Sequence, residues 1–169
     1  MARVAGGDAS AFALLVRRHA EPAQRLARRI LGSAALAEEI VQEAFLRVWT
    51  NAPRWRPQAA FRTWLYRIVI NLCLNATRRA PDLPLSAAGD PADPNDAAGA
   101  LESRERDAAL DTAVDTLPLR QRAAIVLVYQ EGLSNAEAAA ALDISVSALE
   151  ALLVRAKRAL RDALGEEFG

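Results

Sequence analysis

The feature that most constrains the fold is an uninterrupted stretch of 19 residues, Phe61–Arg79 (FRTWLYRIVINLCLNATRR). It has no internal glycine or proline, and Pro57 and Pro81 lie just outside its ends, which predicts a helix of about five turns. Apolar side chains cover most of the predicted helix, so it must pack against other elements on several sides. We expect its core-facing side chains to be Phe61, Trp64, Leu65, Ile68 and Leu72.

One narrow stripe of this helix stays polar. Arg67, Asn71, Asn75 and Arg78 follow one another at i, i+4, i+8 and i+11, with Trp64 beside them. Arginine and carboxamide side chains are those that contact phosphates and base edges of nucleic acids. The stripe is therefore a candidate DNA-contact surface. A buried helix whose polar edge only meets solvent is the other interpretation, and the helix alone leaves both open.

The composition favours helices over sheet. Hydrophobic residues make up 52% of the 169 residues and aromatic residues only 5%. Alanine and leucine, both strong helix formers, are the most frequent among them. We therefore expect an all-α fold.

The formal net charge of zero conceals an asymmetry. Residues 1–80 carry 13 arginines and five acidic residues, whereas residues 81–116 carry two arginines and nine acidic residues. Residues 117–169 are close to neutral, with six basic and seven acidic residues. A cationic front segment separated from a neutral one suggests a polyanion-binding module and a second, distinct module.

A linker is predicted between these modules. The segment 80–99 contains four prolines and four aspartates, and so polar a segment cannot bury enough apolar surface to offset its ordering entropy. We expect two small helical domains, residues 1–80 and 101–169, joined by a flexible acidic linker at 81–100.

Several classes of protein are excluded by what the sequence lacks. No apolar run approaches the roughly 20 residues that span a bilayer, and no signal peptide opens the chain, so we expect a cytoplasmic protein without membrane insertion. The single cysteine, Cys73, cannot form an internal disulfide, and the single histidine, His19, has no partner in a metal or nucleophile pattern. No paired carboxylates or phosphate loop occur, so we expect no enzyme, no cofactor and no metal.

The loop before the long helix is unusual. Residues 51–58 contain two prolines and place Trp55 between Arg54 and Arg56. An indole flanked by two cations suits the stacking of an unpaired base whose phosphates are neutralised nearby. A tryptophan that folds back as a hydrophobic plug is equally compatible with this sequence.

Two further helices are predicted in the front half. The first begins at Ala9 after Asp8, should break or kink near Pro22, and continues to Gly32. The second runs over residues 34–50, and one side of it is apolar (Ile40, Val41, Ala44, Phe45, Val48 and Trp49). Its other side is polar except for one leucine, which suggests a partner surface; it carries Glu39, Gln42, Glu43, Leu46 and Arg47.

The back half should open with two helices. The first spans residues 101–116, and the second spans residues 120–131 with Pro118 at its first position. We expect four leucine and valine side chains to point inward from the first helix and its end: Leu101, Leu110, Val114 and Leu117.

The final segment follows the helix-turn-helix pattern. Ser134–Glu137 is a capping box that opens a short helix ending at Leu142. Asp143 tolerates the left-handed conformation of a tight turn, and Ser145 caps a last helix over residues 146–164. Its outward face, which would meet a major groove, is expected to carry Ser147, Ala148, Ala151, Arg155 and Arg158.

Three segments of the sequence resemble those of a known protein family. AEEIVQEAFLRVW (Ala37–Trp49) followed by FRTWLYRIVINLCLN (Phe61–Asn75) is similar to the second conserved region of bacterial extracytoplasmic-function (ECF) sigma factors. The segment Leu117–Arg161 is similar to their fourth region over its whole length. The resemblance implies binding to core RNA polymerase, recognition of the minus-ten and minus-thirty-five promoter elements, and restraint by an anti-sigma factor.

The resemblance also implies roles for residues. The helix over 34–50 would bind the polymerase clamp through Glu39, Gln42, Glu43, Leu46 and Arg47. The minus-ten element would be bound by the loop and the stripe, that is by Arg54, Trp55, Arg56, Trp64, Arg67, Asn71, Asn75 and Arg78. The minus-thirty-five element would be bound by the last helix, through Ser147, Ala148, Glu150, Ala151, Val154, Arg155 and Arg158.

The chain departs from the family pattern at Glu150, Leu152 and Val154, where relatives often carry basic or polar side chains. Glu150 can accept a hydrogen bond from cytosine but repels phosphates, so we expect the second domain to bind DNA weakly alone. Two alternatives remain: a sigma mimic that sequesters an anti-sigma factor without touching promoters, and a helix-turn-helix repressor with a ligand-binding front half. The intact arginine-carboxamide stripe disfavours the first, and the charge of +8 in residues 1–80 disfavours the second.

Overall fold

The computed structural model describes residues 1–56, 59–79 and 99–168, and all regular secondary structure in these ranges is helical. Most of the predicted linker therefore lies outside the described residues. The elements are α1 (Ala2–Ala5), α2 (Ala9–Leu31), α3 (Ala34–Asn51), the 3₁₀ turn η1 (Ala52–Arg54), α4 (Phe61–Arg79), α5 (Gly99–Thr116), α6 (Leu119–Ile125), the π-helix η2 (Val126–Gln130), α7 (Asn135–Leu142) and α8 (Val146–Phe168). The predicted all-α fold is confirmed.

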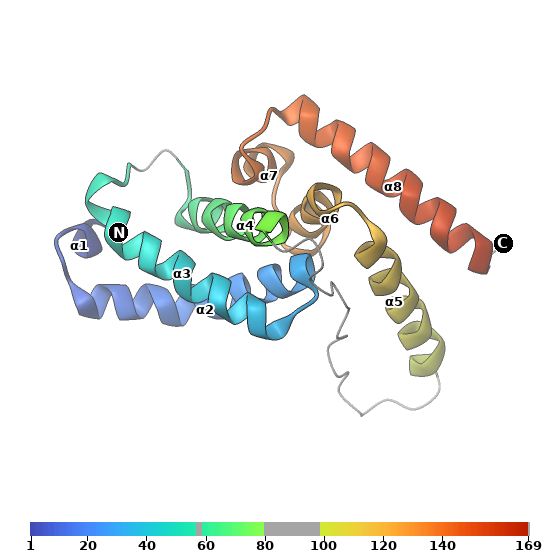
Figure 1. Ribbon diagram of the computed structural model, residues 1–169, viewed down its shortest axis with the longest axis horizontal. Coiled ribbons are helices and arrows are strands. Elements are labelled where there is room, and N and C mark those ends of the chain that lie inside the picture. The colour runs from blue at the N-terminus through green and yellow to red at the C-terminus, as the bar shows by residue number, and fades with distance from the viewer. Residues whose placement is uncertain (57–58, 80–98, 169) are drawn as a thin grey trace.

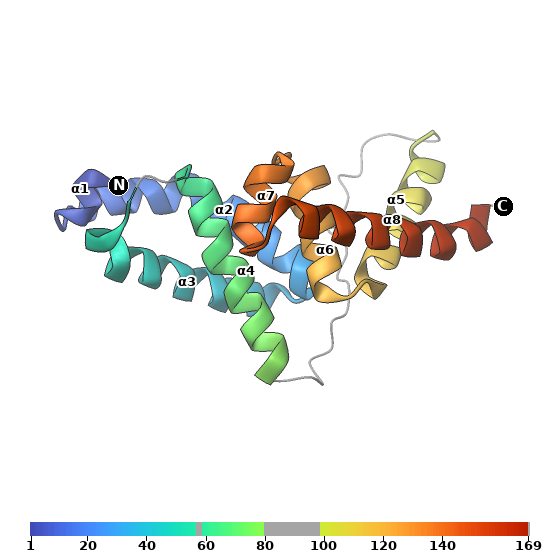
Figure 2. The same cartoon turned by 90° about the horizontal axis from the view of Figure 1, so that it is seen from above.

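In the front half, α2 and α3 lie side by side and α4 crosses both of them (Figures 1 and 2). Local signals set the ends of these helices. The Asp8 carboxylate accepts from the backbone N–H of Ala11 at 2.9 Å, and the Ser33 hydroxyl accepts from that of Leu36 at 3.3 Å. Gly32 ends α2 in the left-handed conformation at φ 67°, which only glycine adopts without cost.

We expected Pro22 to break or kink the first helix, and the break does not occur, since α2 continues from Ala9 to Leu31. An internal proline costs about 3 kcal/mol. The turns after Pro22 bury Leu26, Ile30 and Leu31 almost completely, and each such side chain contributes about 1.5–3 kcal/mol. Packing of these turns against α3 and α4 therefore outweighs the local preference of proline to end a helix.

The back half contains the predicted helix-turn-helix, α7 followed by α8. The capping box forms in both directions: the Ser134 hydroxyl accepts from the backbone N–H of Glu137 at 3.3 Å, and the Glu137 carboxylate accepts from that of Ser134 at 2.9 Å. Asp143 adopts the left-handed conformation at φ 56°, and the Ser145 hydroxyl accepts from the N–H of Ala148 at 3.1 Å. The predicted turn is thus confirmed in its caps and its strained residue.

The predicted helix over 120–131 differs in detail. It begins at Leu119, so Pro118 is the N-cap rather than the first helical residue. Its second half is the π-helix η2, in which the backbone N–H of Glu131 donates to the carbonyl of Val126 at 2.9 Å. The wider turn rotates the end of the helix and directs Glu131 toward α4.

The inward side chains were predicted correctly in part. Val114 and Leu117 are buried, but Leu110 is 41% exposed, so its assignment to the core was wrong. In α8, Leu149, Leu153 and Ala156 form the buried face. The C-terminal part of α8 extends beyond the neighbouring helices (Figure 2).

The two halves pack against each other rather than standing apart. One cluster of buried side chains runs through both halves, and α4 lies against α7 (Figures 1 and 2). Arg122 of α6 is buried, and its Nη1 donates to the carbonyl oxygen of Ile30 in α2 at 3.0 Å. Its Nη2 donates to the carbonyls of Asp115 and Leu117. A single guanidinium therefore binds the end of α2 to the back half.

Candidate functional site

The polar stripe of α4 is exposed as predicted. Arg67, Asn71, Asn75 and Arg78 all lie on the surface, and Nη2 of Arg78 donates to the carboxamide oxygen of Asn75 at 2.7 Å. The prediction of the core-facing side chains of α4 was less accurate. Leu65 and Leu72 are buried as expected, but three of the expected core residues are only half-buried (Phe61, Trp64 and Ile68). Five residues that were not in that set complete the buried face: Thr63, Tyr66, Val69, Ile70 and Cys73.

Beside the stripe lies a cavity of about 520 Å³, here called the tryptophan pocket. Trp55 and Trp64 lie with ring centroids 6.4 Å apart and planes at 56°. Trp55 is half-buried, so it is neither a buried plug nor a free side chain. Most residues that line the pocket come from α3, the following loop and α4, among them Arg47, Asn51, Arg54, Trp55, Arg56, Thr63, Trp64, Arg67, Ile68 and Asn71.

The arrangement suits an unpaired base. Arg54, Arg56 and Arg67 supply cations around two indole rings, which combine phosphate neutralisation with a stacking surface. The sequence placed the Arg54–Arg56 loop immediately before the helix that carries Arg67, and the structure brings these residues to one pocket.

One side of the tryptophan pocket was not predicted. Ala140 of α7 also lines it, and Nη2 of Arg67 lies 2.7 Å from Oδ1 of Asp143. The helix-turn-helix therefore reaches the tryptophan pocket and the polar stripe of the front half. Neither periodicity nor composition signals such a contact between residues 76 positions apart.

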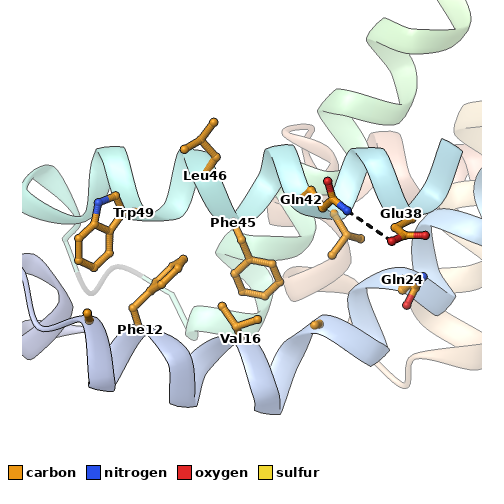
Figure 3. Close-up of a pocket in the computed structure, with 11 residues that line it drawn as sticks. Phe12, Val16, Gln24, Glu38, Gln42, Phe45, Leu46 and Trp49 are labelled. Carbon is orange, nitrogen blue, oxygen red and sulfur yellow. Dashed lines mark hydrogen bonds between the residues drawn. The ribbon is translucent and has the colours of Figure 1, made fainter. Parts of the chain in front are cut away.

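A second cavity, of about 600 Å³, lies between α2 and α3 and is here called the α2–α3 groove (Figure 3). Phe12 and Trp49 face each other across it with ring centroids 5.0 Å apart, and Phe45 meets Phe12 edge-on at 6.3 Å. Leu46 lies at its rim and points away from α2 in Figure 3. At 59% exposed, this leucine confirms the prediction of an apolar side chain on the polar side of α3.

The polar residues around Leu46 also lie on the surface. Nε of Arg47 donates to the Glu43 carboxylate at 2.8 Å, and the Gln42 carboxamide donates to Glu38 at 3.4 Å. Glu39 is exposed without being part of the groove lining. The contribution of α2 to this surface was missed, although Phe12 and Val16 at i and i+4 are the pattern that could have signalled it.

The outward face of α8 is exposed largely as predicted. Ser147, Glu150, Ala151, Val154, Arg155 and Arg158 are exposed and Ala148 is half-buried. Nε of Arg155 donates to the carbonyl of Ala151 at 3.1 Å, and Arg158 lies 4.0 Å from Asp162. Val154, at 67% exposed, and Glu150 dilute the cationic character of this face.

The remaining ionisable groups do not form a reactive site within the described residues. Burial raises the pKa of the Cys73 thiol to about 12. His19 packs edge-on against Phe61 at 4.9 Å, and burial together with the nearby Arg18 and Arg62 lowers its pKa. In the described ranges no group of three or more His, Cys, Asp and Glu side chains is placed to hold a metal ion. Nor does any helix there have the length and hydrophobicity needed to cross a bilayer.

Family models match both halves of the chain. The model described as Sigma-70 region 2 matches residues 15–81, and the model described as Sigma-70, region 4 matches residues 107–160. The gap between the two matches, residues 82–106, contains all of the predicted linker except its first residue.

Curated relatives match along most of the chain. The ECF RNA polymerase sigma factor SigM of Mycobacterium tuberculosis is 35% identical over 94% of this chain and 80% of its own length. SigW of Bacillus subtilis is 33% identical over 96% of this chain and 93% of its own length. SigE of Mycolicibacterium smegmatis is 37% identical over 90% of this chain, which spans 61% of that protein.

Solved structures share the fold of this chain. CnrH, solved in complex with the cytosolic domain of CnrY, is 28% identical and superposes with a TM-score of 0.72 over 98% of this chain and 94% of that chain. The sigma factor RpoE of Bartonella quintana, solved with the anti-sigma factor NepR, shares the fold at 20% identity, with a TM-score of 0.66 over 91% of this chain and 96% of that chain.

Proposed function

The chain belongs to the extracytoplasmic-function group of bacterial sigma factors, and we propose that it binds core RNA polymerase and directs promoter recognition, strand opening and transcription initiation. The observation that carries this proposal is the exposed stripe of Arg67, Asn71, Asn75 and Arg78 beside the tryptophan pocket. In this proposal residues 1–80 bind polymerase and the minus-ten element, and residues 101–169 bind the minus-thirty-five element.

Strand opening requires no catalytic group. An unpaired base stacked in the tryptophan pocket would gain about 1–3 kcal/mol, which is comparable to the few kcal/mol needed to unpair and unstack it. Arg54, Arg56 and Arg67 would neutralise the phosphates on either side of that base, and Asn71 has the donor and acceptor groups to contact base edges. Capture of single strands thus shifts the duplex toward the open form, and the chain acts by binding rather than as an enzyme.

The polymerase contact is proposed on α3, through Glu39, Gln42, Glu43, Leu46 and Arg47. Leu46 supports it, because an exposed apolar side chain surrounded by charged ones matches the apolar core and polar rim of protein interfaces. The α2–α3 groove beside it would extend the same surface with Trp49 and Phe12.

The minus-thirty-five contact is proposed on the outward face of α8. Arg155 and Arg158 would contact phosphates, whereas Glu150 would select for a cytosine amino group at the cost of repelling the backbone. We therefore expect this half to depend on the front half and on polymerase for its affinity. As partners we propose core RNA polymerase, promoter DNA and an anti-sigma factor, and as location the cytoplasm.

A sigma mimic that only captures an anti-sigma factor is the second candidate, and exposed Glu150 favours it. In vitro transcription with purified core polymerase on a randomised promoter library separates the two. A sigma factor gives transcripts that start downstream of a recurring pair of elements, and a mimic gives none. Arg67→Ala and Asn71→Ala should reduce these transcripts while the pull-down of core stays unchanged, and full transcription by both variants would refute the assigned minus-ten surface.

A further inference from the structure

Arg67, a residue of the polar stripe, forms an ion pair with a carboxylate from the other half of the chain. Its Nη2 lies 2.7 Å from Oδ1 of Asp143, the residue that ends α7. Their side chains are 46% and 62% exposed, so the pair lies at the mouth of the tryptophan pocket rather than in the core. Ala140, one turn earlier in α7, lines that pocket.

Asp143 is held in place by its backbone. It adopts φ 56°, its N–H donates to the carbonyl of Ala140 at 3.3 Å, and the capped starts of α7 and α8 fix the chain on both sides. Packing of α7 against α4 then sets the distance to Arg67. A carboxylate held in front of an arginine offers the same charge and hydrogen-bond acceptors as a phosphate oxygen.

Two other contacts hold the same arrangement. Tyr66 directly precedes Arg67 in the sequence, and its hydroxyl donates to the Glu131 carboxylate at 2.6 Å. Arg122 donates to the carbonyl of Ile30. The helix-turn-helix thus closes over the front half through one exposed ion pair and two contacts that are largely shielded from solvent.

We propose that Asp143 is a built-in phosphate mimic, which competes with the DNA strand for Arg67 when the chain is free of polymerase. This inference rests on the proposed function, because it assigns Arg67 to the minus-ten strand. In the closed form one cation of the stripe is neutralised and α7 covers one side of the pocket. A strand can then bind fully only after Asp143 has moved away, so the free chain binds single-stranded DNA more weakly than its front half would allow.

The test is the affinity of the full-length chain for a fluorescent single-stranded oligodeoxynucleotide, without polymerase and at low salt. Asp143→Asn removes the charge but keeps a side chain that tolerates the left-handed conformation. Because exposed ion pairs are weak, the expected gain in affinity is about twofold to fivefold. Glu21→Gln is the matched control, since it also removes an exposed carboxylate that pairs with an arginine, here Arg25 at 2.5 Å.

Repeating both substitutions in a chain that carries Arg67→Gln separates the effect of the Arg67–Asp143 pair from a general effect of lost negative charge. In chains that carry Arg67→Gln, Asp143→Asn should give no more gain than Glu21→Gln does. An equal gain with and without Arg67 overturns the proposal, and so does the absence of any gain over wild type, including the case in which neither protein binds detectably.

Promoter transcription by the wild-type chain with core polymerase distinguishes failure of the proposed function from failure of the phosphate mimic. If that transcription fails, the proposed function fails. If it succeeds and Asp143→Asn binds the oligonucleotide like wild type, only the phosphate mimic is refuted.

Discussion

The hydroxyl of Tyr66 donates a hydrogen bond of 2.6 Å to the carboxylate of Glu131, which joins α4 to the residue that follows the π-helix η2. Tyr66 is buried, and this burial together with the Glu131 carboxylate raises the pKa of its hydroxyl. The group therefore remains protonated and able to donate throughout the physiological range. The bond links two parts of the chain 65 residues apart.

Tyr66→Phe should destabilise the protein by about 1–2 kcal/mol, because it removes a hydrogen bond to a charged acceptor and leaves the Glu131 carboxylate half-buried without it. Urea unfolding followed by circular dichroism measures the change. Tyr129→Phe is the control, since Tyr129 is 54% exposed and its ring contact with Lys157 survives the loss of the hydroxyl. Equal stability of Tyr66→Phe and wild type would show that the bond contributes nothing.

Local structure could be predicted from the sequence because its causes are local. The Ser134–Glu137 capping box, the left-handed Asp143 and the cap at Ser145 each depend on residues within three positions of one another. Pro22 does not end α2, because burial of Leu26 and its neighbours outweighs the preference of proline to end a helix. The π-helix had no signal, since its residues are compatible with either kind of turn.

The candidate site could be predicted on one helix at a time. The stripe of α4 and the exposed Leu46 of α3 follow from helical periodicity alone. The Arg67–Asp143 pair, and the contribution of Phe12 to the α2–α3 groove, depend on how separate helices pack. The charge asymmetry of the sequence suggested a cationic module and a separate second module, and it gave no sign of the core that the two halves share.

Arg122→Met should destabilise the protein more than Tyr66→Phe, by about 2–4 kcal/mol. Methionine fills similar space but leaves the carbonyls of Ile30, Asp115 and Leu117 without their donor. Chemical denaturation provides the measurement. Arg120→Met, two residues earlier and exposed, should remain within about 0.5 kcal/mol of wild type. A similar cost at both positions would contradict the role assigned to the buried guanidinium.

Glu137→Gln should alter the pH dependence of stability. Hydrogen bonds from the Ser134 backbone and hydroxyl lower the pKa of Glu137 below its ordinary value of 4.5. The ionised carboxylate therefore stabilises the folded chain above pH 4.5, and this contribution is lost as the pH falls through the lowered pKa. The difference in thermal midpoint between wild type and Glu137→Gln should be largest near neutral pH and shrink below the lowered pKa. A difference that stays constant with pH would refute this account.

Trp55→Ala should weaken promoter opening, because it removes one of the two indoles of the tryptophan pocket. Stacking on an aromatic ring contributes about 1–3 kcal/mol per base, so open-complex formation with core polymerase should fall by about tenfold or more. Permanganate footprinting of unpaired thymines measures the open complex. Trp55→Phe keeps an aromatic surface and should retain most of the activity. Identical losses in both variants would indicate a folding defect instead of a lost stacking contact.

Leu46→Asp should weaken binding to core polymerase by about tenfold or more, since it places a charge at the proposed centre of the interface. Leu14→Asp provides a close control: Leu14 on α2 is 57% exposed, Leu46 is 59% exposed, and only Leu46 lines the α2–α3 groove. Both substitutions remove an exposed leucine, so both should leave the thermal midpoint nearly unchanged. Binding is measured by titrating labelled variants with purified core. Normal binding by Leu46→Asp, or equal losses in the two variants, would remove this surface of α3 from the polymerase contact.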